Sequence, residues 1–179
     1  MQRWLERAGA LYGRLLDGLA LAACALLLAM TLMICGDVLL RNVPLVPGVH
    51  GLAWADEVSE AMLYLITMLT APWLLRRGQH IRVDVVLRAI PRRLGWYCEW
   101  AVDAIALVGC LVMAVYGARA ALASWESGAL SIKTLVTPEW WLLAPLPLAF
   151  ALLAVEVLFR MRRLALGGRA PRDDAVSAS

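Results

Sequence analysis

Three acidic residues fall within stretches of the sequence that are otherwise apolar. Glu99 and Asp103 are one helical turn apart, and Glu156 lies in a later stretch. Carboxylates cost roughly 2.5–3.5 kcal/mol each to place in a membrane, so they need a role. One role is a path for cations or protons, and the other is a set of ion pairs with nearby arginines that locks helix packing. All three acids lie toward one edge instead of forming a column, which favours the ion pairs.

Other catalytic or ligand-binding chemistry has little support in the residues. The two histidines, His50 and His80, lie outside the apolar stretches, so haem ligation between two membrane helices is not expected. The four cysteines lack CxxC spacing, which argues against a zinc site. The sequence contains no GxSxG, HExxH or glycine-rich phosphate loop. We therefore expect no enzyme activity, no cofactor and no metal.

The apolar stretches that must position the acids are long enough to cross a membrane. The chain is 62% hydrophobic, with a mean hydropathy of +0.71, whereas soluble proteins are roughly 45–50% apolar. No period-2 alternation is present, which predicts helices and not barrel strands. Four spans are expected near residues 16–39, 54–75, 93–118 and 139–160. They form one transmembrane domain, 1–163, followed by a disordered cytoplasmic tail, 164–179.

The distribution of basic residues predicts the orientation of these spans. Fourteen arginines lie before the first span, between the second and third, or after the fourth. Only Arg41, Arg119 and Lys133 lie on the opposite side. Basic residues in short loops stay in the cytoplasm. Both termini and the middle loop are therefore expected to be cytoplasmic, in contact with membrane lipid and not with nucleic acid.

Short amphipathic helices at the membrane surface complete the predicted all-α fold. The segment before the first span has apolar residues at helical spacing, so it either lies flat on the inner leaflet or extends the first span. In the middle loop, Val83, Val86, Leu87 and Ile90 follow the same spacing, and Asp84 is placed to cap that helix. The sequence therefore predicts one interfacial helix before the first span and another between the second and third.

The opposite end of the spans also carries charge. Asp37 and Arg41 have the spacing of a local pair. Trp54 is followed by Asp56, Glu57 and Glu60 in the first turns of the second span, where the positive helix end favours acids, although Glu60 lies deeper and invites a partner.

Prolines predict how the fourth span begins and bends. Thr137 is expected to cap its start and Pro138 to occupy its first turn. Pro145 and Pro147 are expected to kink it.

The order of these features resembles the small membrane subunit, the DctQ family, of tripartite ATP-independent periplasmic (TRAP) transporters. "DVLLRNV" closes the first span, and "WADEVSEAMLYLITM" resembles the family's tryptophan followed by paired acids. "RRGQHIRVDVVLRAIPRR" resembles its middle loop, which is the most specific signal. "YGARAALASWESG" and "TPEWWLLAPLPLAF" resemble the end of its third helix and the start of its fourth. The resemblance covers about residues 16 to 163.

The resemblance implies a non-catalytic scaffold subunit in a bacterial inner membrane. It implies two protein partners: a large multi-span permease subunit with the sodium and substrate sites, and a periplasmic binding protein that delivers an organic acid. The loop residues expected to fix structure are Arg76, Arg77, Gly78, His80 and Asp84. The residues expected to contact partners or form ion pairs are Arg41, Trp54, Asp56, Glu57, Glu60, Glu99, Asp103 and Glu156.

Two alternative functions follow from the residues alone. The first is an autonomous small cation- or proton-coupled transporter or channel, with Glu99, Asp103 and Glu156 as its path. The second is a membrane anchor for a redox enzyme, which the positions of the two histidines disfavour.

Overall fold

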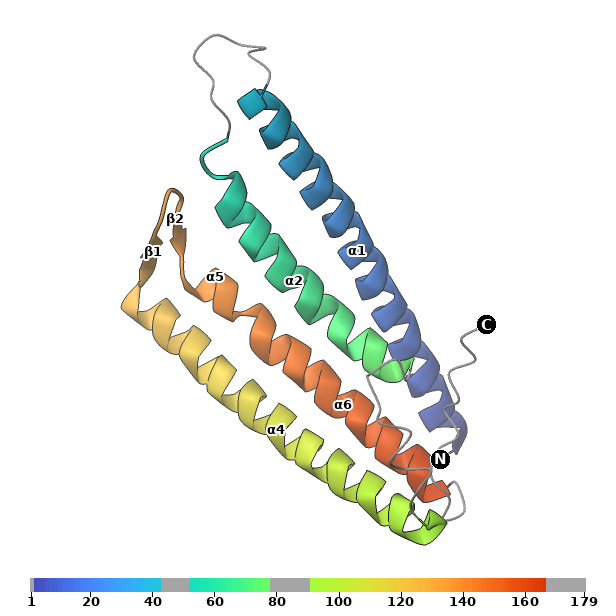
Figure 1. The fold of residues 1–179 in the computed structure, drawn as a ribbon. Helices are drawn as coiled ribbons and strands as arrows, with labels where there is room; N and C mark the ends of the chain where they lie inside the picture. The colour runs from blue at the N-terminus through green and yellow to red at the C-terminus, as the bar shows by residue number, and fades with distance from the viewer. Residues whose placement is uncertain (1, 43–51, 78–90, 167–179) are drawn as a thin grey trace.

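The computed structural model describes residues 2–42, 52–77 and 91–166, and these residues form five helices and a short hairpin (Figure 1). The helices are α1 (Gln2–Asn42), α2 (Ala55–Arg76), α4 (Arg92–Ser127), α5 (Trp140–Leu143) and α6 (Pro145–Leu166). The strands β1 (Leu130–Ile132) and β2 (Val136–Pro138) form an antiparallel hairpin between α4 and α5. Four segments are long and apolar enough to cross a membrane: Gly9–Asn42, Ala55–Arg76, Leu94–Ser127 and Trp140–Ala165. The prediction of four membrane-spanning helices is confirmed.

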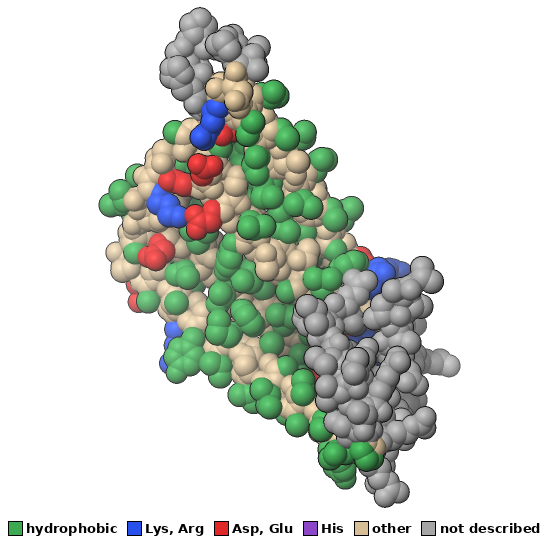
Figure 2. Space-filling view, in the orientation of Figure 1, with side chains coloured by type: hydrophobic (Ala, Val, Ile, Leu, Met, Phe, Trp, Pro, Cys, Tyr) green, Lys and Arg blue, Asp and Glu red, His purple; other side chains and the backbone are tan. Residues whose placement is uncertain are grey.

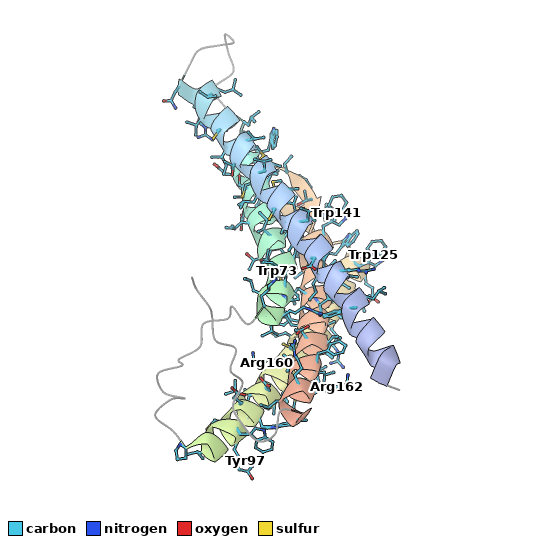
Figure 3. All side chains as sticks on the ribbon, turned by 90° about the vertical axis from the view of Figure 1, so that its right-hand side faces the viewer. Trp73, Tyr97, Trp125, Trp141, Arg160 and Arg162 are labelled. Atoms are coloured by element: carbon cyan, nitrogen blue, oxygen red, sulfur yellow. The ribbon has the colours of Figure 1, made fainter. Side chains whose placement is uncertain are left out.

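The spanning helices stand side by side in the order α1, α2, α6, α4, so the last helix of the sequence lies between the second and third spans (Figure 1). One end of this row contains the start of α1, the end of α2, the start of α4 and the end of α6. We call it the arginine-rich end; Arg160 and Arg162 lie there together with Tyr97 (Figure 3). The opposite end, with β1 and β2, is the hairpin end.

The buried core of the row is small. Half of its buried apolar residues are alanines, and the larger ones are Leu16, Leu75, Val157 and Leu164. Along the two outer helices, large apolar side chains are exposed, among them Leu21 on α1 at 73% and Ile105 on α4 at 72%. In a bilayer such surfaces face lipid or another membrane protein.

The N-terminal segment continues the first span. α1 runs without a break from Gln2 to Asn42, which agrees with the alternative of a simple extension of the first span. A separate interfacial helix before that span is not seen among the described residues. A helix keeps all its backbone hydrogen bonds when it continues, whereas a bend would leave some unsatisfied. The second expected interfacial helix, in the middle loop, lies outside the described residues, as does the tail beyond residue 166.

The third and fourth spans end and begin differently from the prediction. α4 continues well past residue 118 to Ser127 and ends at Gly128, whose φ of 62° suits glycine at a helix C-terminus. The fourth span is interrupted at Ala144, directly before Pro145, as its prolines suggested. Thr137 and Pro138 do not start the helix, because both lie in β2 and pair with Ser131 and Leu130.

Candidate functional site

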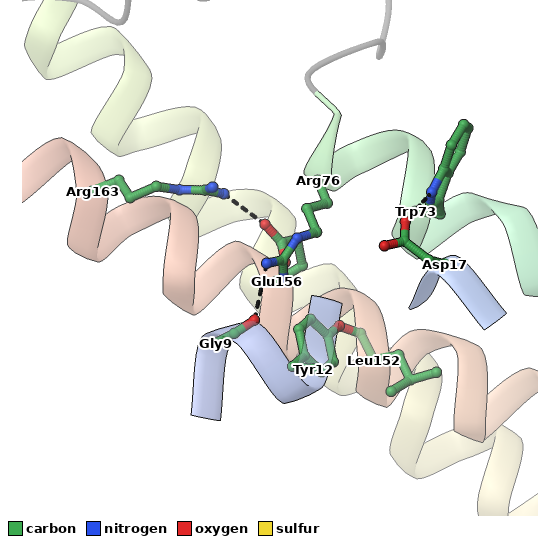
Figure 4. A network of polar contacts seen from close by, with 8 residues as sticks. All are labelled: Gly9, Tyr12, Asp17, Trp73, Arg76, Leu152, Glu156 and Arg163. Atoms are coloured by element: carbon green, nitrogen blue, oxygen red, sulfur yellow. Dashed lines mark hydrogen bonds and ion pairs between the residues drawn. The ribbon is translucent and has the colours of Figure 1, made fainter. Parts of the chain in front are cut away.

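The carboxylate of Glu156 is the centre of a polar cluster at the arginine-rich end (Figure 4). Its side chain is fully buried, at 0% exposed. Arg163, two turns later on α6, donates a hydrogen bond from Nη2 to Glu156 Oε1 at 2.6 Å. Arg76, in the last turn of α2, places Nη1 3.6 Å from Glu156 Oε2. One carboxylate therefore contacts two guanidinium groups and joins α2 to α6, which offsets the cost of burying it.

The same arginine connects α1 to this cluster (Figure 4). Arg76 Nη2 donates to the carbonyl oxygen of Gly9 at 2.9 Å, and its guanidinium lies 5.7 Å from the ring centroid of Tyr12. The Tyr12 hydroxyl donates to the carbonyl oxygen of Leu152 on α6 at 2.7 Å. Gly13 leaves room for this approach, because a Cβ there would lie 2.7 Å from Arg76 Nη2 and would displace the guanidinium. The start of α1 is thus fixed against both α2 and α6.

A second contact between α1 and α2 lies one turn farther along α1. Trp73 Nε1 donates to Asp17 Oδ1 at 2.9 Å, and Arg77 Nη2 lies 3.8 Å from the same oxygen. The Arg77 guanidinium also stacks 4.8 Å from the centroid of the Trp73 ring. Arg77, which stands at the start of the basic middle loop, thus also links α1 to α2.

The remaining two intramembrane acids lie between α4 and α6. Asp103, 2% exposed, has Oδ1 3.1 Å from Nε of Arg160 on α6. Glu99, one turn earlier, is buried and also has an interaction partner. Asp103 and Glu156 are therefore both ion-paired to arginines at the arginine-rich end.

At the hairpin end, Asp37 organises the approach to α2. Its carboxylate lies 2.7 Å from Arg41 Nε and accepts a hydrogen bond from the backbone N–H of Leu52 at 2.6 Å. Arg41 also lies 3.9 Å from Asp56, whose side chain is 88% exposed. Trp54 precedes α2 and is 39% exposed.

The acids in the first turns of α2 hold the tip of the hairpin, a contact we call the hairpin clamp. Glu57 accepts hydrogen bonds from the backbone N–H groups of Thr134 at 2.5 Å and Leu135 at 2.9 Å. Glu60 lies 2.9 Å from Lys133 Nζ. The hydrogen bond and charge of Glu60 raise the pKa of Lys133 above its usual value. Acidic and basic side chains gather here on a face that is otherwise largely apolar (Figure 2).

Sequence reasoning found most of these residues and the local pair of Asp37 with Arg41, but not the pairs between distant segments. Glu60 was expected to need a partner, yet nothing in "SIKTLV" predicted a hairpin that would supply it, because the tip lacks the glycine, asparagine or proline of common turns. Tyr12 and Asp17 were not among the expected site residues. Of the middle-loop set, Arg76 and Arg77 belong to the clusters, whereas Gly78, His80 and Asp84 lie outside the described residues.

Between the two ends the helices are apolar. Residues 18–36, 61–75, 104–118 and 140–155 contain no Asp, Glu, Lys or Arg. A groove of about 750 Å³ between α1, α2 and the α5–α6 segment contains apolar side chains, including Leu19, Met68 and Leu148. Within the described parts of the chain, no group of three or more His, Cys, Asp or Glu residues could hold a metal ion. The charges therefore form two separate layers instead of a continuous path.

The family model for the DctQ component of tripartite ATP-independent periplasmic transporters matches residues 30–167, well over half of the chain. The chain belongs to the DctQ family. A comparison with curated proteins gives no match. The DctQ match runs from within α1 through the hairpin clamp to the end of α6, and it confirms the resemblance that the sequence motifs suggested. This DctQ-family protein is therefore a multi-pass membrane component of a transporter and not an enzyme by family.

Proposed function

We propose that this DctQ-family protein is a fixed wall of a TRAP transporter in a bacterial inner membrane, placed beside a large multi-span permease subunit. The permease would carry out ion-driven uptake, with Na⁺ as the coupling ion, of an organic acid brought by a periplasmic binding protein. The DctQ-family chain would supply rigidity and surface without touching the substrate. The arginine-rich end would face the cytoplasm, in keeping with the positive-inside rule.

The observation that supports this proposal best is the separation of charge from apolar surface. Charged side chains pair with one another at the two ends, while the outer helices expose leucine and isoleucine over the membrane depth. A pore needs polar groups through its middle, and four central segments here have no charged residue. Such a molecule suits side-by-side contact with another membrane protein.

One set of experiments distinguishes the scaffold subunit from an autonomous transporter. A tagged chain isolated from its native membranes should recover a larger multi-span protein. In proteoliposomes, the chain alone should take up no organic acid, whereas the complex with its binding protein should do so when a Na⁺ gradient is applied. Uptake by the chain alone that Asp103→Asn abolishes without loss of folded protein would establish the autonomous transporter instead.

Asp56 is an acid at the hairpin end whose surface remains open for a partner. Glu57 and Glu60 are engaged in the hairpin clamp, whereas Asp56 has its side chain 88% exposed. We expect Asp56→Arg to weaken co-purification of the permease or the binding protein. Glu126→Arg, at an exposed acid near the end of α4, is the matched control. Equal losses of co-purified partner from both variants would show that Asp56 is not part of the interface.

The orientation has a separate test. Ser127 and Ala165 are exposed residues at the hairpin and arginine-rich ends, respectively. With the native cysteines removed, Ser127→Cys should react with an impermeant maleimide in spheroplasts, and Ala165→Cys only after lysis. The reverse pattern would invert the proposed topology.

A further inference from the structure

The hairpin of β1 and β2 is amphipathic, but its polar side faces inward. Paired residues of an antiparallel hairpin share a face, and the faces alternate along each strand. Ser131 pairs with Thr137, and both line a cavity of about 320 Å³ beside α2 that also includes Tyr64. Ile132 pairs with Val136 on the other face.

The outward side is an apolar hairpin face made of Leu130, Ile132, Val136 and Pro138. Ile132 is 83% exposed, Val136 61% and Leu130 57%. Lys133 is the one charged residue between positions 130 and 138, and it is held by Glu60 in the hairpin clamp. A face of this composition is unfavourable in water and indicates an apolar environment outside the chain.

The apolar hairpin face continues into a cluster of tryptophans. Leu130 and Pro138 line a small hollow together with Trp125 and Trp140. The Trp125 and Trp140 rings meet edge to face with centroids 4.7 Å apart, and Trp141 lies 5.9 Å from Trp140. Trp125 and Trp141 lie near one another on one side of the molecule (Figure 3). Both of these side chains are 60% exposed.

The position of this cluster matches the headgroup layer of a bilayer. Along α4, Trp96 and Trp125 are separated by roughly 44 Å at about 1.5 Å per residue. A bilayer with its interfacial regions is about 40–45 Å thick, and tryptophan is enriched at both of its surfaces. If Trp96 lies at one membrane surface, this spacing places Trp125 at the other, on the hairpin end where the apolar hairpin face begins.

We propose that the apolar hairpin face lies in the interfacial layer of the bilayer and contacts lipid. The hairpin clamp holds the hairpin down on α2, so that Ile132 and Val136 enter the layer beside the tryptophans. Amphipathic helices at a membrane surface bury their apolar face at the boundary of headgroups and acyl chains, and the amphipathic hairpin would do the same. The DctQ chain would thereby fix its depth at the hairpin end, just as the arginines do at the other end. This inference does not depend on the proposed scaffold function.

Spin-label accessibility tests the proposal on the full-length chain in phospholipid nanodiscs, with the native cysteines replaced by alanine. Labels at Ile132→Cys and Val136→Cys should show a ratio of oxygen to nickel-chelate accessibility below that of Ile105→Cys, which lies near the middle of α4, but well above that of a label in water. Asp56→Cys is the water-exposed control and should give a much lower ratio.

A ratio at both hairpin sites equal to that of Asp56→Cys would overturn the proposal, because the face would then be in water. The same labels are measured in the complex isolated with its larger subunit. Retention of the high oxygen ratio supports lipid contact, whereas loss of both oxygen and nickel accessibility shows that protein covers the face and rejects lipid as its partner.

Discussion

Replacing Glu156 with alanine tests whether one buried carboxylate holds α1, α2 and α6 together. Removing one member of a buried ion pair costs about 3–5 kcal/mol, because the partner charge is left unpaired. Here Arg163 is 54% exposed and can turn toward water, so the loss should be at or below the low end of that range. We expect Glu156→Ala to lower the free energy of unfolding by about 2–3 kcal/mol.

The matched variants separate the carboxylate from its surroundings. Arg163→Ala should cost only about 1 kcal/mol, since Arg76 still faces the carboxylate and the lost arginine was half exposed. Glu156→Gln keeps the shape and one hydrogen-bond acceptor, so its loss should lie between those of the two alanine variants. Unfolding by steric trapping in lipid bicelles measures all three on one scale. The double variant Glu156→Ala/Arg163→Ala should lose less than the sum of the single losses.

The charge-pairing argument fails if Glu156→Ala is no less stable than Arg163→Ala. It also fails if Glu156→Gln matches the wild type, because shape would then suffice without charge. An additive double variant would show that the 2.6 Å contact between Arg163 and Glu156 contributes no coupling.

Three further predictions concern packing, the hairpin clamp and its pH dependence. Gly117→Ala should be less stable than Gly109→Ala by about 1–3 kcal/mol, because a Cβ at Gly117 would overlap the Leu146 side chain of α6. Gly109→Ala on the same helix meets nothing within 4 Å and should be neutral or slightly stabilising, because alanine favours a helix more than glycine does. Glu57→Ala should raise the mobility of a spin label on the hairpin tip, while Asp56→Ala leaves it unchanged; equal mobility in the two variants would disprove the clamp. Because the pKa of Lys133 is raised in the folded state, its ion pair stabilises the hairpin fully below the usual lysine value of 10.5 and is lost as the pH rises above it. The mobility of the label should therefore stay constant from pH 7 to well into the alkaline range. A rise in its mobility at mildly alkaline pH would contradict this.

The sequence predicts the parts of the fold that depend on a single segment. The second span was expected at 54–75 and α2 is Ala55–Arg76, because its apolar run is bounded by Trp54 and by the arginines. The interruption before Pro145 follows from the missing proline N–H. Local pairs such as Asp37 with Arg41 are also readable, since their spacing is that of one helix turn.

The contacts that join distant segments were not predictable from one sequence. The Tyr12 hydroxyl reaches Leu152, and Glu57 reaches Thr134, only because of the order in which the helices stand. Helical spacing shows which residues share a face of one helix, but it says nothing about which helix that face meets. The end of α4 was also missed. Its last turns are polar and resemble a loop in the sequence, and only the structure shows that the hairpin begins after Gly128.

The position of the charges explains how a single row of helices keeps its order in a membrane. Lipid tails are as apolar as leucine, so the apolar contacts between the helices give little net drive to associate. The helix order must then be held by polar groups whose separation costs free energy. These groups are the buried carboxylates with their arginines at one end and the hairpin clamp at the other. Between those layers the helices can present leucine and isoleucine outward without loss of stability. A chain built in this way keeps broad apolar surfaces for lipid and a partner protein while its own helices stay in register.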